Sequence, residues 1–231
     1  MFSIVIPTHN EEKRIHDTLE KLLKFLHRFR KPYEIIIVDD GHDRTLDIVS
    51  EFVHVKRNHV QLLRFNHRQG KGKALVEGMK KAKGDAIITY DADGAAPPKE
   101  IPKLLKELKR SDVVIGSRAL EHAVIVGTVP NRRRIASKSF NTLIDFLFQL
   151  GVKDTQCGFK GIKRNKILPL LNQFKQHGFE WDVELLLRAK KAGLRIKEIP
   201  IEWHHKKEGK VVYRDVMRML KGVVKLKREM G

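Results

Sequence analysis

Hydrophobic and polar positions along the chain follow two spacings, one typical of strands and one typical of helices. Residues 2–7 (FSIVIP) and 33–40 (YEIIIVDD) are short runs rich in β-branched residues and end in turn-forming residues. Between them, residues 11–29 carry apolar side chains at helical spacing, namely Ile15, Leu19, Leu22, Leu23 and Leu26. The pattern predicts a strand, a helix and a second strand.

The same alternation continues to residue 118. Helices are expected over 44–57, 72–82 and 98–110, and strands over 60–65, 85–93 and 112–118. Strands that alternate with helices predict an α/β fold with a doubly wound, mainly parallel sheet. Because no Pro-, Gly- or Ser-rich linker divides the chain, we expect one domain over 1–205, followed by an amphipathic C-terminal extension over 206–231.

A polar cluster follows each of five predicted strands. The clusters are PTHNEE (7–12), DDGHDRT (39–45), NHRQGKGK (66–73), DADG (91–94) and GSR (116–118). Ligands bind along the carboxyl ends of the strands in open sheets of this kind, so the sequence predicts one shared site. Neither G-x-G-x-x-G after the first strand nor a P-loop is present, which disfavours a dinucleotide or P-loop domain.

Asp91 and Asp93 are the candidate metal ligands. They lie two residues apart at the end of an apolar run, and Gly94 lets the chain turn so that both carboxylates reach one ion. Hard oxygen ligands suit Mg²⁺ or Mn²⁺ bridging to a substrate diphosphate. An isolated D-x-D motif is more often a plain turn and helix cap, which here would precede Pro97. The four partner clusters favour the metal interpretation in this chain.

Composition narrows the function classes further. The net charge is +19, which would attract nucleic acid, an anionic membrane or phosphorylated substrates. Tyr and Trp are scarce and no RNA-binding signature appears, so nucleic acid is disfavoured. The single Cys157 and the absence of a secretory leader indicate a reducing cytoplasm, and the apolar stretch 140–152 is shorter than the ~20 residues of a membrane span.

Several segments, in order across residues 2–203, resemble the family-2 inverting glycosyltransferases, within them the enzymes that make polyprenyl-phosphate sugars. The segments are IVIPTHNEE, IIIVDDGHDRT, GKGKALVEGMKKAKGDAIITYDADG, DVVIGSR, DTQCGFKGIKR and EWDVELLLRAKKAGLRIKEIPIEW. The resemblance implies the glycosyltransferase A fold, which is a Rossmann-like nucleotide-sugar fold. The segments DTQCGFK and WDVELL look most like dolichyl-phosphate β-glucosyltransferases, and the front half is equally similar to dolichyl-phosphate mannose synthases.

The resemblance also implies roles for individual residues. The implied nucleotide-sugar site consists of Pro7, His9, Glu11, Asp39, Asp40, Lys73, Asp91, Ala92, Asp93 and Arg118. Asp91 and Asp93 would hold the metal, and the guanidinium of Arg118 offers a fork to phosphate. The chain departs from the family at three places: the segment DDGHDRT is one residue shorter than usual and places His42 in its turn, His9 replaces a common Tyr, and Ala95 replaces a metal-binding Gln of the mannose synthases.

A lipid phosphate acceptor would need cations and no general base. Its second pKa is about 6, so it is largely dianionic at neutral pH. Basic runs at Arg132–Arg134 and at 206–210 are candidates to bind the acceptor phosphate and the diphosphate. The residues expected to bind these phosphates are Arg133, Arg134, Lys206, Lys207 and Lys210, and Arg133 matches the phosphate-binding arginine of the family.

The segment EWDVE (180–184) lies on the acceptor side by this interpretation. With Asp93 and Arg118, we take Asp182 and Glu184 as candidate catalytic residues that shape the acceptor site. The alternative is that one of them is the base for a glycan or protein hydroxyl. The donor is UDP-glucose or GDP-mannose, with UDP-glucose slightly favoured by the resemblance.

Two segments are candidates to reach a membrane. Residues 132–150 join basic residues to an apolar helix, and residues 211–229 predict a cationic amphipathic helix. The apolar side of the second helix would bind lipid, the domain itself or a second subunit. We therefore expect a cytoplasmic protein, peripheral on an anionic membrane surface, with a membrane protein or a second copy as further candidate partners.

Overall fold

A seven-stranded sheet forms the centre of the computed structural model, which describes residues 1–56, 59–206 and 213–230, with the side chains of Arg133 and 213–218 outside the description. The strand order is β3-β2-β1-β4-β7-β5-β8. The strands are β1 (Phe2–Thr8), β2 (Tyr33–Asp39), β3 (Val60–Arg64), β4 (Ala86–Thr89), β5 (Val113–Ser117), β7 (Lys160–Lys163) and β8 (Ile196–Pro200). All neighbouring pairs are parallel except those that β7 makes with β4 and β5.

The central strands are apolar on both faces because helices cover both. Strand β1 pairs with β2 in the register Ile4↔Ile35 and with β4 in the register Ile4↔Ile88. All three side chains are fully buried. Such near-continuous β-branched runs are typical of parallel sheets that are shielded from water on each side.

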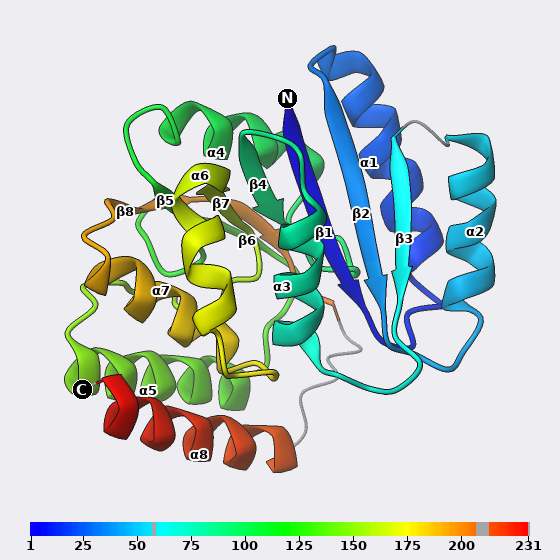
Figure 1. Cartoon of the computed structure of the whole chain (residues 1–231). Coiled ribbons are helices and arrows are strands. Elements are labelled where there is room, and N and C mark those ends of the chain that lie inside the picture. The colour runs from blue at the N-terminus through cyan, green and yellow to red at the C-terminus, as the bar shows by residue number, and fades with distance from the viewer. Residues whose placement is uncertain (57–58, 207–212, 231) are drawn as a thin grey trace.

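Helices flank the sheet as two layers (Figure 1). One layer holds α1 (Ile15–Phe29), α2 (Thr45–Val55) and α4 (Ile101–Glu107), which follows the short 3₁₀ turn η1 (Pro98–Glu100). The other holds α3 (Lys71–Lys81), α6 (Arg164–Ile167), η2 (Leu168–Gln173) and α7 (Trp181–Lys191). The α/β, mainly parallel architecture expected from the alternation is confirmed.

Three features of the sheet differ from or add to the expected pattern. The strand expected over 85–93 ends at Thr89, so Asp91 and Asp93 lie in the turn that follows it. The antiparallel strand β7 was not expected, and neither was a second, two-stranded sheet formed by β6 (Val124–Val126) and β9 (Glu202–His204). Runs of three or four residues are too short to show a strand period.

Two long helices lie side by side below the carboxyl ends of the strands, as Figure 1 shows. They are α5 (Asn131–Phe148) and α8 (Tyr213–Met230). The described apolar side chains of α8 that face inward, Met219, Val223 and Leu226, are buried against the domain. Of the alternatives left open for this helix, the structure thus favours packing on the domain.

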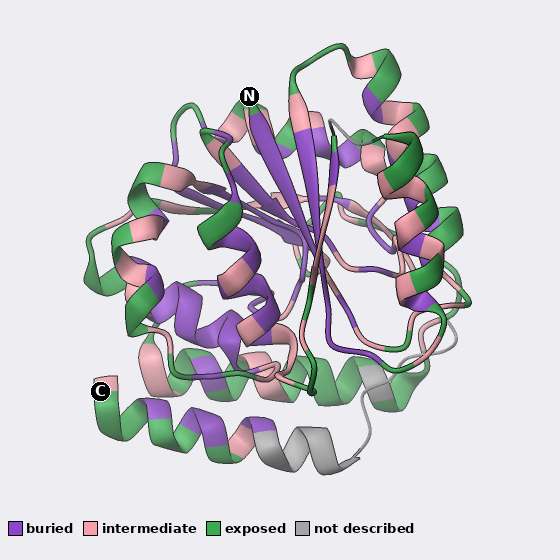
Figure 2. Cartoon of the chain, turned by 45° about the vertical axis from the view of Figure 1, so that its right-hand side comes forward, coloured by how far each residue is buried: buried purple, intermediate pink, exposed green. Residues whose placement is uncertain are grey.

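Burial divides these two helices (Figure 2). On α8 a buried stripe alternates with exposed Lys221, Lys225 and Arg228, whereas on α5 only Ile144 is buried among the described side chains. No helix in the described ranges combines the length and the apolar character needed to cross a bilayer.

Candidate active site

The five polar clusters meet at the carboxyl edge of the sheet, as the sequence predicted. Strands β1 to β4 and β5 all deliver their C-terminal ends to this edge. Because β7 runs antiparallel, the segment that precedes it, residues 154–159, arrives at the same edge. The antiparallel strand therefore adds a sixth segment to the site.

Asp40 links three of the clusters to one another. Its Oδ2 accepts hydrogen bonds from the amides of Gln69 (2.9 Å) and Gly70 (2.7 Å), and its Oδ1 lies 2.9 Å from His9 Nδ1. The carboxylate is 3% exposed, so its partners are protein groups. Asp40 therefore positions the loops after β1, β2 and β3, and its carboxylate also holds the His9 ring in place.

Asp39, Pro7 and Glu11 line the same end of the edge. Asp39 Oδ1 accepts a hydrogen bond from Thr8 Oγ1 at 2.7 Å, and burial raises the pKa of the Asp39 carboxyl. Pro7 lies in β1 opposite Val38, where β1 still pairs with β2. Glu11 Oε2 lies 2.6 Å from Arg14 Nη2.

Asp91 and Asp93 sit in a tight turn beyond β4. Gly94 has φ +60°, and the Ala95 amide donates a hydrogen bond to Asp93 Oδ1 at 3.0 Å. Burial and the negative charge of Asp91 raise the pKa of the Asp93 carboxyl. The backbone carbonyl of Ala92 accepts a hydrogen bond from Thr18 Oγ1 at 2.9 Å, which fixes the turn on α1.

This pair of carboxylates fits a hard divalent cation. Two neighbouring carboxylates repel each other in a partly buried turn, and a cation bound between them would remove this repulsion. Within the described ranges, no third His, Cys, Asp or Glu joins them to form a complete protein cage. A cation here would therefore take its remaining ligands from a substrate and from water, as Mg²⁺ commonly does.

Lys71 is the cation that faces Asp91, and the sequence analysis missed it in favour of Lys73. Lys71 Nζ lies 3.0 Å from Asp91 Oδ1 and 3.6 Å from Asp182 Oδ2. Burial would raise the pKa of Asp91, but the charge of Lys71 outweighs it and the pKa is lowered. Lys73 Nζ instead binds Glu77, one turn further along α3, at 2.9 Å, so the structure does not bring this predicted residue together with Asp91.

The choice between the two lysines depends on where α3 begins. The helix starts at Lys71, one residue earlier than expected, and residues two apart on a helix point in different directions. Gly72 between them packs so tightly that a Cβ there would lie 2.6 Å from Gln176 O. This close approach brings Lys71 to the edge of the sheet and turns Lys73 away from it.

A chain of alternating charges runs inward from Asp91. Lys71 joins Asp91 to Asp182, and Asp182 Oδ1 accepts a short hydrogen bond from Lys160 Nζ. Lys160 is fully buried and also donates to the Cys157 carbonyl at 2.5 Å. Asp182 thus touches the site through Lys71 rather than through solvent.

Glu184, the other predicted acceptor-side carboxylate, does not reach the site. It is fully buried, and its oxygens accept hydrogen bonds from Arg188 Nε (2.9 Å) and from the amides of Lys175 (3.0 Å) and Gln176 (2.8 Å). These contacts hold the loop between η2 and α7. The structure thus places Glu184 away from the other predicted site residues, and its printed contacts are with the loop and with Arg188.

Gly158 lets the chain pass directly against Asp91. A Cβ at this position would lie 2.5 Å from Asp91 Cγ, so any side chain here would push the Asp91 carboxylate aside. Cys157 beside it is buried, and burial raises the pKa of its thiol to about 12. The segment 154–159 thus forms one wall of the turn that holds Asp91.

Arg118 is held from two sides. Its Nε and Nη2 donate to the carboxylate of Asp154 at 2.7 and 2.8 Å, and its backbone amide donates to the same group at 2.9 Å. The Trp203 ring lies 5.3 Å from the guanidinium carbon, in cation–π geometry. The predicted fork is therefore turned toward Asp154, and the remaining N–H groups are those left to bind a ligand.

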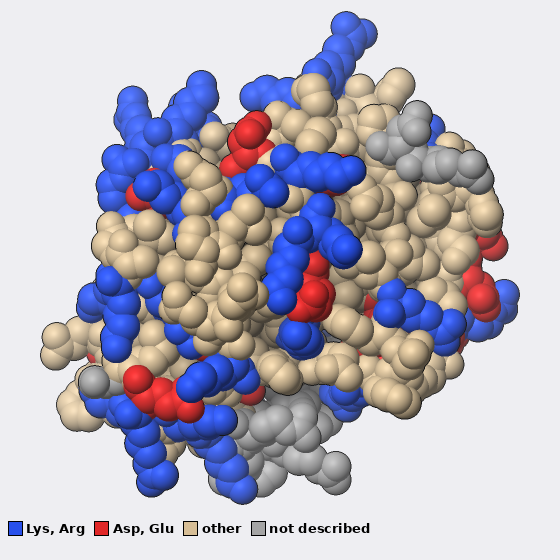
Figure 3. All heavy atoms as spheres, viewed as in Figure 1, with Lys and Arg blue, Asp and Glu red and all other residues tan. Residues whose placement is uncertain are grey.

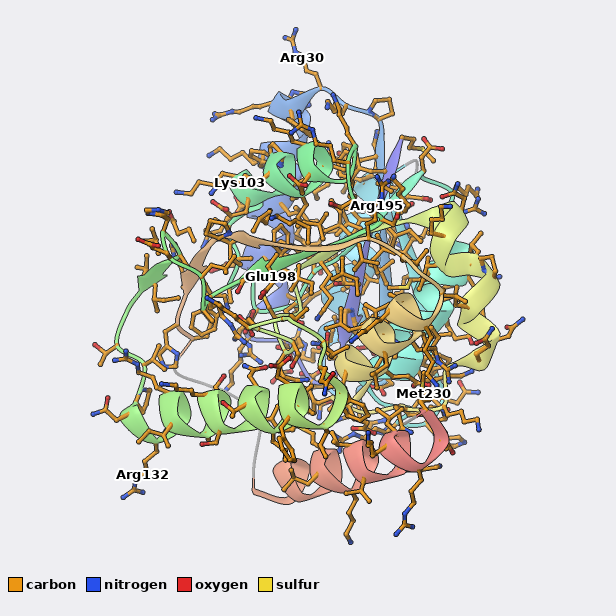
Figure 4. All side chains as sticks on the ribbon, turned by 90° about the vertical axis from the view of Figure 1, so that its left-hand side faces the viewer. Arg30, Lys103, Arg132, Arg195, Glu198 and Met230 are labelled. Atoms are coloured by element: carbon orange, nitrogen blue, oxygen red, sulfur yellow. The ribbon has the colours of Figure 1, made fainter. Side chains whose placement is uncertain are left out.

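A cleft of about 1070 Å³ opens beside Arg118. Its walls are α5, β6, Trp203 and the loop 151–154. Arg134 and Lys138 line it from α5, whereas Arg132 points away from the molecule (Figure 4). Of the other predicted acceptor-binding groups, Lys206 is partly exposed beyond β9, and the Arg133 side chain, Lys207 and Lys210 lie outside the described residues.

Comparison with known proteins identifies the same family as the motifs. The model of the protein family described as "Glycosyl transferase family 2" matches residues 3–169 of this chain. A dolichyl-phosphate β-glucosyltransferase of Saccharomyces cerevisiae is 34% identical over 245 residues, covering 96% of this chain and 72% of that protein. A glycosyltransferase of Haloferax volcanii is 28% identical over 222 residues, and this chain spans 35% of its length.

Solved structures share the fold at low identity. One such structure is glucosyl-3-phosphoglycerate synthase from Mycobacterium tuberculosis, solved with Mn²⁺, UDP and glucosyl-3-phosphoglycerate. Its TM-score is 0.72 at 17% identity, and the match covers 99% of this chain and 79% of the synthase chain. Mannosyl-3-phosphoglycerate synthase from Rubrobacter xylanophilus has the same TM-score and identity, with 99% and 73% coverage. The glycosyltransferase A fold predicted from the resemblance is confirmed.

Proposed function

The chain belongs to glycosyl transferase family 2, and on that premise we propose that it transfers glucose from UDP-glucose to a polyprenyl phosphate of the dolichyl type. The observation that carries the proposal is the pair Asp91 and Asp93, which stand at the sheet edge beside Lys71 and within electrostatic reach of Arg118. Arg118 in turn lines the open cleft. The carboxylates proposed to act on the donor thus lie next to the cleft proposed to admit the acceptor.

The names of the relatives favour glucose as the sugar. The S. cerevisiae protein and another relative, from Trichomonas vaginalis at 33% identity and covered over 70% of its length, are both dolichyl-phosphate β-glucosyltransferases. GDP-mannose is the second candidate donor, because the glucosyl and mannosyl neighbours match the fold equally well. The fold alone does not select the sugar.

The nucleoside would lie at the end of the edge where Pro7, Glu11 and Asp39 stand. The carboxylate of Asp39 suits the donor groups of a base or ribose, and Asp40 with His9 holds the surrounding loops in place. Lys71 and Arg118 would bind the diphosphate and the sugar. Asp91 and Asp93 would hold Mg²⁺ or Mn²⁺, which supplies positive charge for the departing diphosphate.

The acceptor phosphate would bind in the cleft, against Arg134 and Lys138. One of its oxygens attacks the anomeric carbon, the new carbon–oxygen bond forms, and the bond to the nucleoside diphosphate breaks with its electron pair on the diphosphate. Because the acceptor is already dianionic, no base is needed. The burial and pairing of Asp182 support such an acceptor, since that carboxylate is already neutralised by Lys160 and Lys71.

We infer further that the protein works as a peripheral enzyme on the cytoplasmic face of a membrane. Its acceptor class resides in bilayers, and its net charge of +19 attracts anionic headgroups. A membrane protein partner is compatible with this arrangement.

The proposal is tested by a substrate panel. Purified protein is incubated with UDP-glucose or GDP-mannose, Mg²⁺ or Mn²⁺, and either a short, water-soluble polyprenyl phosphate or a sugar with free hydroxyls, and products are weighed by mass spectrometry. We expect a glucosyl phospholipid from UDP-glucose and a divalent ion, and none from the Asp91→Ala, Asp93→Ala variant. Product formed only on hydroxyl acceptors would refute the lipid assignment, and product formed only from GDP-mannose would refute the donor.

A further inference from the structure

The N-terminal half of α5 stands clear of the rest of the domain. Every described side chain from Asn131 to Ser139 is exposed, on all sides of the helix. In Figure 2 the exposed colour prevails on α5, with intermediate segments and one buried position, while α8 beside it has a buried stripe. A helix without a buried face gains little stability from packing, so a partner of this chain is expected to cover part of it.

Two large apolar side chains on one side of α5 face water. Ile135 is 66% exposed and Phe146 is 80% exposed. They are eleven residues apart, about three helical turns, and so lie on one side of the helix. We call Ile135, Ser139 and Phe146 the outer stripe.

A second apolar patch lies across the cleft. Val124, Ile125 and Val126 make up β6, and all three are exposed. Ile125 also lines the cleft, and Arg134, next to Ile135 in the chain, lines it from the opposite wall. Exposed apolar side chains therefore stand on both sides of the cleft, as at surfaces that contact a partner or a membrane.

The charge around these patches is positive. Helix α5 contains Arg132, Arg133, Arg134 and Lys138, and Asp145 is its single acidic residue. Lys221, Lys225 and Arg228 are exposed on α8 alongside. Figure 3 shows Lys and Arg side chains projecting at the lower edge of the molecule, the side on which α5 and α8 lie in Figure 1.

We propose that the outer stripe of α5 and the β6 patch form a surface that docks into a bilayer with anionic headgroups, so that the cleft between them opens directly into the lipid. The proposal rests on the proposed function and adds to it the face by which the enzyme meets its acceptor. It assigns membrane contact to the exposed side chains of α5 and β6, with the inner face of α8 packed on the domain.

A bilayer fits this surface better than a second copy of the chain. Apolar side chains beside cationic ones suit the boundary between acyl chains and anionic headgroups. In a symmetric dimer the same basic residues of α5 would face each other, and like charges across an interface oppose association. The bilayer also provides what the cleft would receive, a phosphate joined to an apolar chain.

The test compares two acceptors and two variants. The Ile135→Ser, Phe146→Ser double variant removes the outer stripe, and Val55→Ser, an exposed valine on α2, is the matched control. Each protein is sedimented with vesicles of phosphatidylcholine, with and without phosphatidylglycerol. Transfer is then assayed with polyprenyl phosphate embedded in the vesicles and with a short, water-soluble polyprenyl phosphate. Sedimentation velocity without lipid records the oligomeric state.

We expect the double variant to lose about tenfold or more in vesicle binding and in transfer to the embedded acceptor, and to keep its transfer to the soluble acceptor. Binding by the unaltered protein should need phosphatidylglycerol and fall with salt. The proposal is overturned if the double variant binds and acts on vesicles as Val55→Ser does, if it loses the soluble reaction equally, or if the stripe instead holds a dimer together. If the unaltered protein transfers to neither acceptor, the proposed function fails, and the vesicle-binding result still decides the docking surface.

Discussion

The donor half and the acceptor half of the site are built in opposite ways. In the donor half, Asp40, Lys71 and Asp182 are largely buried and joined by ion pairs and backbone amides. In the acceptor half, α5 and β6 are exposed and border a wide cleft. On the proposed function, the charges that would stabilise a leaving diphosphate are held in place by the fold, whereas the surface proposed to meet lipid gains its contacts only at the membrane.

The largest effect is expected from the buried charge chain. Lys160→Met leaves Asp182 buried with only the more distant Lys71, and we expect a loss of about 3–5 kcal/mol in the free energy of unfolding, measured with urea. Adding Asp182→Leu should recover most of it, because both charges are then gone. The acceptor half supplies the contrast: Phe146→Ser should stay within about 0.5 kcal/mol. If Lys160→Met and Phe146→Ser lowered the free energy of unfolding equally, the contrast between the buried donor half and the exposed acceptor half would be wrong.

Lys71 and Lys73 provide a matched pair within the donor half. We expect Lys71→Met to lower kcat/KM by about 10²-fold, since it removes a cation beside the reacting phosphates, and Lys73→Met to change it less than about twofold. Steady-state kinetics with UDP-glucose compares them. A larger loss in Lys73→Met would mean that the sequence-based choice was right and the contacts of Lys71 are incidental.

Gly158→Ala tests how finely the turn is positioned. The added methyl group displaces Asp91, and we expect at least about a tenfold loss of activity with the fold retained, as circular dichroism would show. The control is Gly193→Ala, at φ +67° with open space around it, which should cost about 1 kcal/mol of stability and no activity. If Gly158→Ala is fully active, the turn is looser than its contacts indicate.

The smallest effect concerns Asp93 and pH. Burial and the charge of Asp91 raise the pKa of the Asp93 carboxyl in the folded protein. Ionised Asp93 therefore lowers the free energy of unfolding. This loss of stability is absent below the pKa that Asp93 has in the unfolded chain, and it appears as pH rises through the folded pKa. Asp93→Asn should therefore raise the melting temperature slightly at neutral pH without metal, and the gain should vanish in acid. A gain that persists unchanged at low pH would point to a cause other than charge.

The sequence could predict the edge of the sheet because periodicity locates strand ends. It predicted that 7–12, 39–45, 66–73, 91–94 and 116–118 would meet, and they do. It could not predict contacts that depend on tertiary packing. The partner of Arg118 is Asp154, brought in by the antiparallel β7, and Glu184 is consumed by Arg188 and two amides. The contact of Arg118 joins residues far apart in the chain and leaves no mark in local spacing. The i,i+4 spacing of Glu184 and Arg188 does suggest their pairing, but not the burial of Glu184 or its two amide partners.

The exposed surface of α5 was only half predictable for a related reason. An apolar, basic helix reads the same from its sequence whether it packs on a domain or faces a membrane. Burial separates α5 from α8, the two segments that the sequence offered as candidates to reach a membrane.

The central claim is that Asp91 and Asp93 share a divalent cation with the donor diphosphate. Isothermal titration of UDP into the protein, with and without Mn²⁺, tests it directly. We expect Mn²⁺ to tighten UDP binding in the unaltered protein and in Lys73→Met, and to have no effect in the Asp91→Ala, Asp93→Ala variant. Unchanged Mn²⁺-dependent binding in that double variant would contradict the account.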